Sequence, residues 1–272
     1  MADSLHQGRV AGTHWDPAQY ARFGDHRLRP ALELLARVTT DNPAVVYDLG
    51  CGSGEVTRMI AARWPGSRVW GVDNSAEMLA RASATTGPVT WQNADIREWV
   101  PEVAPDLIYT NAALQWVEDH ETLFPGLARL LNPGGCLAVQ MPLSWGMPSH
   151  RLMRDVLDNG GPHGEPLGSD QLRASVAKKW VADPEVYFDW LRHCSREIDI
   201  WTTTYLQVLE GENPVVEWVK GTGLRPILND LDEAQREQFL AEYTRRIARQ
   251  YPVREDGRTV YPFERLFIVV TA

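Results

Sequence analysis

The chain has few cysteines and no long apolar run, and each shortage excludes a class of protein. Its 272 residues include three cysteines, Cys51, Cys136 and Cys194, with no C-x-x-C pair among them. This usage argues against a disulfide framework and favours the reduced thiols of a cytoplasmic protein. Residues 1–13 lack the apolar core of a signal peptide, and no stretch approaches the roughly 20 apolar residues of a membrane helix. We therefore expect a cytoplasmic protein that does not associate with membranes.

Positive charge and metal-ligand motifs are also scarce. Lys and Arg number 27 against 36 Asp and Glu, so the formal net charge is -9. Nucleic-acid binding needs a basic surface, and we expect no nucleic-acid partner for an acidic chain. The seven histidines are scattered without an H-E-x-x-H or similar spacing, so no metal site is expected. No obligate protein partner is evident from the sequence.

What the chain does have is a glycine-rich segment between a predicted strand and a predicted helix. Residues 44–54 read A-V-V-Y-D-L-G-C-G-S-G, a short apolar run that stops at Gly50, Gly52 and Gly54. Glycines crowded between a strand and a helix let the backbone approach a ligand without a Cβ in the way. Asp48, at the strand end, adds a carboxylate acceptor. This segment predicts a small-molecule site.

The residue after the third glycine helps to identify the class of ligand that this segment binds. The dinucleotide fingerprint G-x-G-x-x-G requires a glycine where this chain has Glu55. An acidic side chain there would repel a pyrophosphate at the helix N-terminus that should attract it. The G-K-[ST] of a phosphate-binding loop is also absent. We therefore expect a ligand that is neutral or cationic near the glycines.

Polar side chains end the next predicted strands as well. Asp73 ends the apolar run 67–73, Asp95 follows the strand-like run 89–92, and Asn111 ends the next one. The carboxyl ends of parallel strands meet at one edge of a sheet and border a crevice there. A carboxylate at the end of the second strand of such a unit commonly binds the hydroxyls of a ribose.

The order of the predicted elements indicates the fold class. Strands and helices alternate to about residue 141, which predicts an α/β, doubly wound, mostly parallel sheet. With late strands at 197–209 and 259–270, the sheet has seven strands. Helical segments at about 142–195 and 210–256 follow the fifth and sixth strands. We expect both to lie above the carboxyl edge as a lid, because burying the reacting groups removes water. The whole chain, 1–272, is expected to form one domain.

Together these motifs resemble the class I S-adenosylmethionine (SAM)-dependent methyltransferases. The resemblance is carried by D-L-G-C-G-S-G, by Asp73, by Ala94-Asp95-Ile96 and by L-N-P-G-G at 131–135. It implies a Rossmann-like fold, SAM as cofactor and S-adenosyl-L-homocysteine as product. It also implies that Asp73 binds the ribose and that Asp95 and Ile96 border the adenine. The full set of cofactor residues is then Asp48, Gly50, Gly52, Gly54, Asp73, Asn74, Met78, Asp95, Ile96, Asn111 and Tyr20, the last on an N-terminal helix.

The methyl acceptor must be inferred from residues outside the glycine segment. Residues 111–116 read N-A-A-L-Q-W, in place of the N-P-P-Y of methyltransferases that modify amino groups of nucleic acids. T-G-L-R-P at 222–226 puts Arg225 in a short turn between two predicted helices. A guanidinium there can grip a carboxylate with two hydrogen bonds. An ion pair with a lid acid, or a helix cap, is the structural alternative.

Several late blocks are similar to the trans-aconitate 2-methyltransferase branch of this family. They include P-S-H at 148–150, T-G-L-R-P at 222–226 and R-L-F-I-V at 265–269. The implied reaction is methyl esterification of a carboxylate of trans-aconitate, a tricarboxylate. Carboxylates are already ionised at neutral pH, so direct in-line attack on the methyl group needs no general base, and no catalytic residue is expected. The alternative is another small carboxylic acid or small metabolite.

The resemblance also implies a set of substrate-binding residues, chosen by polarity and by their place in these blocks. They are Arg225 first, then Arg29, Trp116, Trp145, His150, Tyr205, Tyr261 and Arg265. For the aromatic residues, packing in the core is the structural alternative.

Overall fold

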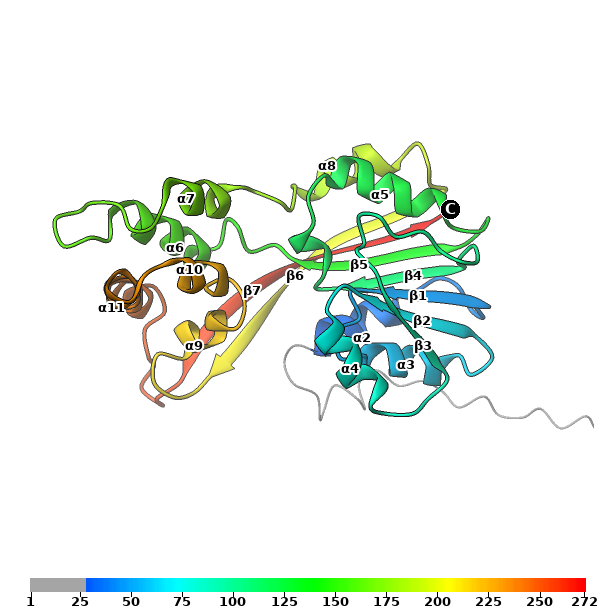
Figure 1. The fold of residues 1–272 in the computed structure, drawn as a ribbon, viewed down its shortest axis with the longest axis horizontal. Helices are drawn as coiled ribbons and strands as arrows, with labels where there is room; N and C mark the ends of the chain where they lie inside the picture. Colours follow the sequence, from blue (N-terminus) through cyan, green and yellow to red (C-terminus); the bar gives the residue numbers. More distant parts are fainter. Residues whose placement is uncertain (1–27) are drawn as a thin grey trace, which may run out of the picture.

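The computed structural model describes residues 28–272, and Tyr20 lies outside them. These residues form one seven-stranded sheet with the strand order β3-β2-β1-β4-β5-β7-β6 (Figure 1). The strands, in chain order, are β1 (Val45–Leu49), β2 (Arg68–Asp73), β3 (Val89–Asn93), β4 (Leu107–Asn111), β5 (Cys136–Pro142), β6 (Glu197–Leu209) and β7 (Thr259–Thr271). β7 alone runs opposite to the other six strands, so the predicted α/β, mostly parallel seven-stranded sheet is confirmed.

Helices cover both faces of this sheet and also form a separate group beyond it. In chain order the helical elements are α2 (Leu28–Ala36), α3 (Glu55–Arg63), α4 (Ala76–Ser83), the 3₁₀ helix η1 (Leu114–Trp116), α5 (His120–Arg129), α6 (Pro148–Asn159), α7 (Asp170–Ala177), α8 (Pro184–Leu191), α9 (Pro214–Lys220), α10 (Arg225–Asp230) and α11 (Glu233–Gln250).

The core of the sheet half has two layers because the central strands are apolar on both faces. Every residue of β1 is buried, as a parallel strand covered on both sides requires. One face packs against α5 and α8, with Phe124 and Tyr187 in its core. The other face packs against α2 and α3, with Leu35 and Ile60 in its core. The helices thus cover both faces of the sheet, and the carboxyl ends of the parallel strands lie uncovered by them at one edge.

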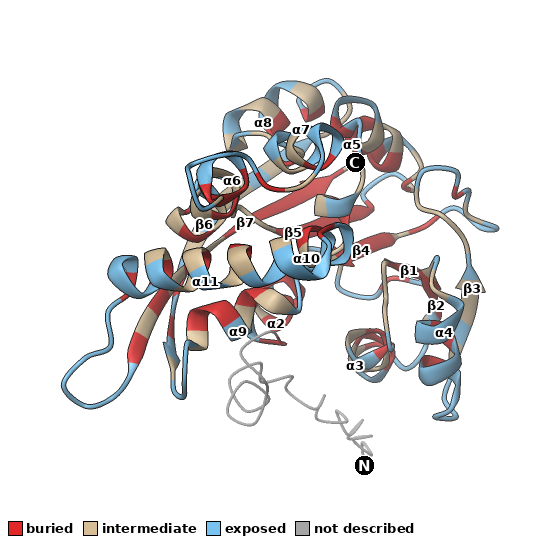
Figure 2. Ribbon diagram, turned by 60° about the vertical axis from the view of Figure 1, so that its left-hand side comes forward, coloured by how far each residue is buried: buried red, intermediate tan, exposed pale blue. Residues whose placement is uncertain are grey.

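The two late strands are much longer than the others and extend past the sheet. Beyond the ends of β4 and β5 they carry a second group of helices, α6, α7, α9, α10 and α11, which we call the helical lobe (Figure 1). Tyr261 and Phe263 of β7 lie in the apolar core of this lobe. Figure 2 shows the buried residues of β7 running from the lobe into the sheet. The lobe is therefore joined to the sheet by a continuous β-ribbon as well as by loops.

Two expectations about the helical segments are corrected here. The first segment, 142–195, does not form one unit, because α8 packs against α5 and β6 on the face of the sheet. In the second segment, Arg225 is not in a turn: it is the first residue of α10. Pro226 follows it in the first helical turn, where the missing N–H of proline costs no hydrogen bond.

Candidate active site

The segment Gly50–Gly54, here called the glycine loop, is held by its own backbone. Gly50, Gly52 and Gly54 have φ values of 73°, 54° and 75°, in the left-handed region that favours glycine. The N–H groups of Gly50 and Cys51 donate to the carbonyl oxygen of Val72 at 2.8 and 3.0 Å. A Cβ on Gly50 would lie 2.2 Å from the Cβ of Ala113. The loop therefore fits tightly between β2 and the turn after β4.

Asp73 ties this loop to the end of β2. One carboxylate oxygen accepts a hydrogen bond from the Gly52 N–H at 2.8 Å, and the other accepts one from the Ser75 N–H at 2.8 Å. Ser75 in turn caps α4 by accepting from the Met78 N–H at 3.3 Å. A carboxylate has about four lone-pair positions, so both oxygens keep capacity for further donors. Asn74 and Met78 are exposed beside it.

Asp48 does not lie on the ligand side of the loop. Its side chain is 2% exposed and accepts a hydrogen bond from the Thr57 hydroxyl of α3 at 2.6 Å. Burial raises the pKa of this carboxyl to about 7, against the opposing effect of the Thr57 hydrogen bond. The expectation that Asp48 offers an acceptor to the ligand is therefore corrected: Asp48 supports the loop from behind.

The end of β3 brings Asp95 and Ile96 to the same edge. The Arg97 guanidinium donates to both oxygens of Asp95, at 3.0 and 2.5 Å, and these hydrogen bonds hold the pKa of Asp95 at about 2. The Ile96 side chain lies 3.8 Å from where a Cβ on Gly50 would sit. Asn93 donates from its side chain to the carbonyl oxygen of Asp73 at 3.1 Å. The carboxyl ends of β1, β2 and β3 thus meet as predicted.

Trp91 of β3 is a residue of this edge that the sequence analysis missed. Its ring lies across two glycines, because a Cβ on Gly54 or on Gly71 would approach it to 2.3 or 2.4 Å. The Arg58 guanidinium lies over the same ring, 5.9 Å from its centroid. A glycine inside a strand marks close approach of another group, so Gly71 was the available signal.

The turn after β4 completes the edge. Ala112 has a φ of 54°, uncommon for a residue with a Cβ, and its N–H donates to the Gln140 carbonyl oxygen at 2.9 Å. Asn111 is half-buried, and its Oδ1 has no hydrogen-bond partner within the described residues. Trp116, the last residue of η1, is 57% exposed. A buried histidine, His120, fixes this segment because its Nε2 donates to the Leu114 carbonyl oxygen at 2.9 Å.

A polar group that we call the junction cluster lies where β6 and β7 leave the sheet. It consists of Arg29, Glu33, Gln140, Tyr205 and Arg265. The Arg265 side chain donates to Gln140 Oε1 at 3.2 Å, the Tyr205 hydroxyl donates to Glu33 Oε2 at 2.5 Å, and Arg29 Nε donates to Glu33 Oε1 at 2.7 Å. The Arg29 guanidinium also lies over the Tyr205 ring, 5.1 Å from its centroid. Burial raises the pKa of Tyr205, and the charges of Arg29 and Arg265 both oppose that rise, which links the two sets of contacts. Three of the predicted substrate residues, Arg29, Tyr205 and Arg265, are thus brought near one another from α2, β6 and β7.

Three other predicted substrate residues, Tyr261, His150 and Arg225, lie in the helical lobe. The Ser149 hydroxyl and the Tyr261 hydroxyl are 2.9 Å apart, which fastens the start of α6 to β7. His150 is half-buried beside Gly223, where a Cβ would lie 2.9 Å from its Nε2. Burial lowers the pKa of His150 to about 4, with Arg154 as a second cause. Arg225, two residues after Gly223, is exposed at the start of α10.

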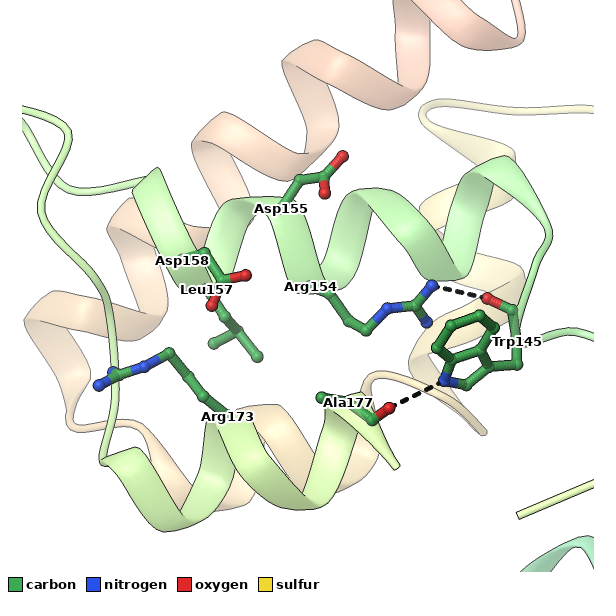
Figure 3. A pocket seen from close by; sticks show the side chains of 7 residues that line it. All are labelled: Trp145, Arg154, Asp155, Leu157, Asp158, Arg173 and Ala177. Atoms are coloured by element: carbon green, nitrogen blue, oxygen red, sulfur yellow. Dashed lines mark hydrogen bonds between the residues drawn. The ribbon is translucent and has the colours of Figure 1, made fainter. Parts of the chain in front are cut away.

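Trp145 lies beside a pocket of about 210 Å³ between α6 and α7. Its indole N–H donates to the Ala177 carbonyl oxygen at 3.1 Å, and Arg154 donates to the Trp145 carbonyl oxygen at 2.8 Å (Figure 3). The Arg154 guanidinium also lies 4.2 Å from the indole centroid. These contacts bind the predicted substrate residue Trp145 to the lobe, so it closes one end of this pocket.

Two features are absent from residues 28–272. No helix there is both long and apolar enough to cross a membrane. No group of three or more His, Cys, Asp or Glu side chains there has the arrangement of a metal site.

Comparisons with known proteins identify relatives of the whole chain. A family model described as a methyltransferase domain matches residues 46–135. A trans-aconitate 2-methyltransferase of Azoarcus sp. (strain BH72) is 47% identical over 256 residues, covering 94% of this chain and 98% of that protein. One of Streptomyces avermitilis is 47% identical over 263 residues, covering 94% and 96%.

The solved structures support the fold. Phosphoethanolamine N-methyltransferase 2 of Haemonchus contortus, in complex with phosphomonomethylethanolamine and S-adenosylhomocysteine, matches with a TM-score of 0.51. The two sequences are 17% identical, and the match covers 89% of this chain and 52% of that one. The fold and the full-length similarity lead to one conclusion. The chain belongs to the trans-aconitate 2-methyltransferase family and is a SAM-dependent methyltransferase.

Proposed function

We propose that this enzyme transfers the methyl group of SAM to a carboxylate of trans-aconitate and releases the monomethyl ester and S-adenosyl-L-homocysteine. The observation that carries the proposal is the full-length similarity to relatives named for this reaction, at 47% identity over 94% of the chain. The junction cluster adds support, since it offers buried cationic and donor groups at the carboxyl edge of the sheet.

The cofactor fits the edge built around the glycine loop. Asp73 has lone pairs left for the ribose hydroxyls, and Asp95 with Ile96 provides a polar and an apolar border for the adenine. The buried Oδ1 of Asn111 is an acceptor without a partner in residues 28–272, which suits the ammonium of the methionine part. Asn74 and Met78, at the start of α4, and Tyr20, outside the described residues, complete the proposed cofactor set. SAM supplies an electrophilic methyl group when it is bound.

The substrate carries three negative charges into an acidic protein, so local cations must outweigh the global field. Arg265 is 6% exposed at the junction, and Arg29 of α2 lies over the Tyr205 ring. We propose these two guanidinium groups as the principal carboxylate-binding groups of the site. Arg225 and His150 would meet the substrate from the lobe side, with Trp116 and Tyr205 at the borders. Trp145 and Tyr261 would act through packing, because their polar atoms are bonded within the lobe.

The proposed mechanism uses position and not proton transfer. A carboxylate with a reference pKa near ~4 is already deprotonated at neutral pH, so its oxygen can attack the methyl group in line. Holding the two reactants at near-attack distance can contribute on the order of 7–11 kcal/mol. No residue of this chain then needs to accept a proton, and none is proposed as a catalytic base.

We further propose that the chain acts as one domain, 1–272, in which the helical lobe covers the carboxyl edge. The lobe unites parts of both expected lid segments, 142–195 and 210–256, around one apolar core. Covering the site would exclude water that competes for the methyl group. The three free cysteines are those of a protein in a reducing compartment, which supports a cytoplasmic reaction.

The test is a product assay with SAM and a panel of acids: trans-aconitate, cis-aconitate, isocitrate and itaconate. Mass spectrometry should detect a single methyl ester, formed fastest with trans-aconitate. An Asp73→Ala variant, which loses the acceptor for the Gly52 N–H, serves as the control and should form much less ester. An ester formed only on another acid would favour the alternative substrate class, another small carboxylic acid or small metabolite. No ester on any acid contradicts the proposal.

A further inference from the structure

The junction cluster contains one buried donor that the residues around it leave unused. The Gln140 side chain of β5 is 0% exposed, and its Nε2 has no hydrogen-bond partner within residues 28–272. Buried side-chain amides in folded proteins are nearly always hydrogen-bonded, because an unpaired N–H loses its hydration without replacement. An orphan of this kind needs an explanation, and a ligand with an acceptor atom at this edge of the sheet would supply one.

The Arg265 guanidinium shows which atom of the Gln140 amide lacks a hydrogen-bond partner. An arginine side chain has only donors, so the Gln140 atom that accepts the hydrogen bond from Arg265 at 3.2 Å must be the oxygen Oε1. The NH₂ group of Gln140 is consequently the end without a partner. Arg265 is itself 6% exposed, so this orientation is held in a largely water-free place.

The position of Gln140 in the sheet puts it at the acceptor side of the proposed site. It pairs with Asn111 of β4 on one side and with Phe267 of β7 on the other. Its backbone oxygen receives the Ala112 N–H of the turn that packs on the glycine loop. Gln140 therefore lies between the proposed cofactor edge and the Arg265 guanidinium.

We propose that Gln140 Nε2 donates a hydrogen bond to a carboxylate oxygen of the methyl acceptor, with Arg265 holding the amide in the required orientation. This inference deepens the proposed function and rests on it. A carboxylate oxygen only accepts hydrogen bonds, so it satisfies the NH₂ group, whereas a protonated amine has no lone pair with which to accept. Gln140 would thereby select an acid over a small amine in a site that Arg265 already makes electropositive.

The test compares Gln140→Met with Gln207→Met in the full chain. Gln207 is the matched control, since it is a buried glutamine, 3% exposed, on the same face of the neighbouring strand pair. Loss of one hydrogen bond to a charged group should raise the KM for trans-aconitate about 10- to 100-fold in the Gln140 variant. The Kd for SAM should stay within about twofold of wild type in both variants, and the Gln207 variant should keep its KM.

A second variant guards against loss of folding in the first. Gln140→Glu keeps the side-chain length and still gives Arg265 an acceptor. It replaces the NH₂ donor with a carboxylate oxygen, which would face the carboxylate of the substrate. It should raise the KM more than Gln140→Met does, because like charges repel in a buried site. An unchanged KM in either folded variant overturns the proposal. So does a weakened Kd for SAM with a normal KM, which would assign the donor to the cofactor.

The failure of this inference is distinguishable from the failure of the proposed function. If wild type esterifies a different acid of the panel, the proposed substrate is wrong, and the KM for that acid tests Gln140 in the same way. If wild type esterifies no acid, both are overturned together. If wild type esterifies trans-aconitate and Gln140→Met matches it, the role of Gln140 alone is wrong.

Discussion

The glycine loop and the junction cluster are held together by different kinds of contact. The loop is one short segment, and its contacts are mostly backbone hydrogen bonds, to Val72 and to the Asp73 carboxylate. The junction cluster takes side chains from α2, β5, β6 and β7, and its contacts are between side chains. Backbone contacts depend on conformation, whereas side-chain contacts depend on residue identity. The loop therefore suits a fixed cofactor, and the junction suits the part of the reaction that distinguishes one relative from another.

The loop should be the more sensitive of the two regions to a single methyl group. Gly50→Ala forces a Cβ into a left-handed residue, at about 1 kcal/mol or more of strain, and drives it against Ala113. We expect SAM affinity to fall on the order of 100-fold or more, measured by isothermal titration. Gly52→Ala separates the two causes, since its φ is also positive but nothing lies within 4 Å of its Cβ. Equal losses in the two variants would mean that contact with Ala113 is unimportant.

The stability of the loop region should fall as the pH rises. The folded-state pKa of Asp48, raised to about 7, lies above the value of an unfolded aspartate, so the folded state binds the extra proton between about pH 4 and 7. The free energy of unfolding should decrease across that window by up to ~4 kcal/mol from this group. Asp48→Asn resembles the protonated form and should remove that decrease. Denaturant titrations of both proteins at pH 4.5, 6 and 7.5 measure it, and parallel pH profiles would contradict the burial argument.

The helical lobe should respond to pH in the opposite direction. The pKa of His150 is lowered to about 4, below its unfolded value, so the unfolded state binds the extra proton between about pH 4 and 6.5. This group should therefore add stability as the pH rises through that window, by at most ~3 kcal/mol and less because the ring is partly exposed. His150→Gln should flatten that part of the profile while leaving the Asp48 contribution in place. A steeper profile in the variant would refute the assignment.

The junction should affect the acceptor and leave the cofactor alone. Arg265→Met removes the buried guanidinium, and we expect kcat/KM for trans-aconitate to fall about 100-fold with little change in the Kd for SAM. Arg258→Met is the control, because Arg258 forms an exposed pair with Glu210 at 2.9 Å and such pairs contribute little. Steady-state kinetics and a SAM titration on each variant decide it. Comparable losses in both variants would place the effect in general electrostatics.

The features of the fold and site that sequence patterns predicted correctly are those that depend on residues close together in the chain. The strands, the three left-handed glycines and the cluster of Asp73 and Ile96 at one edge lie where alternation and spacing put them. Asp48 was assigned to the wrong side because a strand residue's face depends on which helix covers it. Trp91 was missed because its role depends on Gly71 of the neighbouring strand. Gln140 was given no role because a glutamine in an apolar strand has no local signature of function.

The sequence by itself determined the fold class, the glycine loop and the family, because short-range spacing encodes backbone conformation and full-length similarity encodes descent. Only the tertiary structure decided that α8 belongs to the sheet and that Arg225 begins a helix. It also decided that Arg29, Glu33, Gln140, Tyr205 and Arg265 share one site. The physical reason is that these five residues meet through the register of β5, β7 and β6 and the packing of α2. Both depend on contacts between segments far apart in the chain.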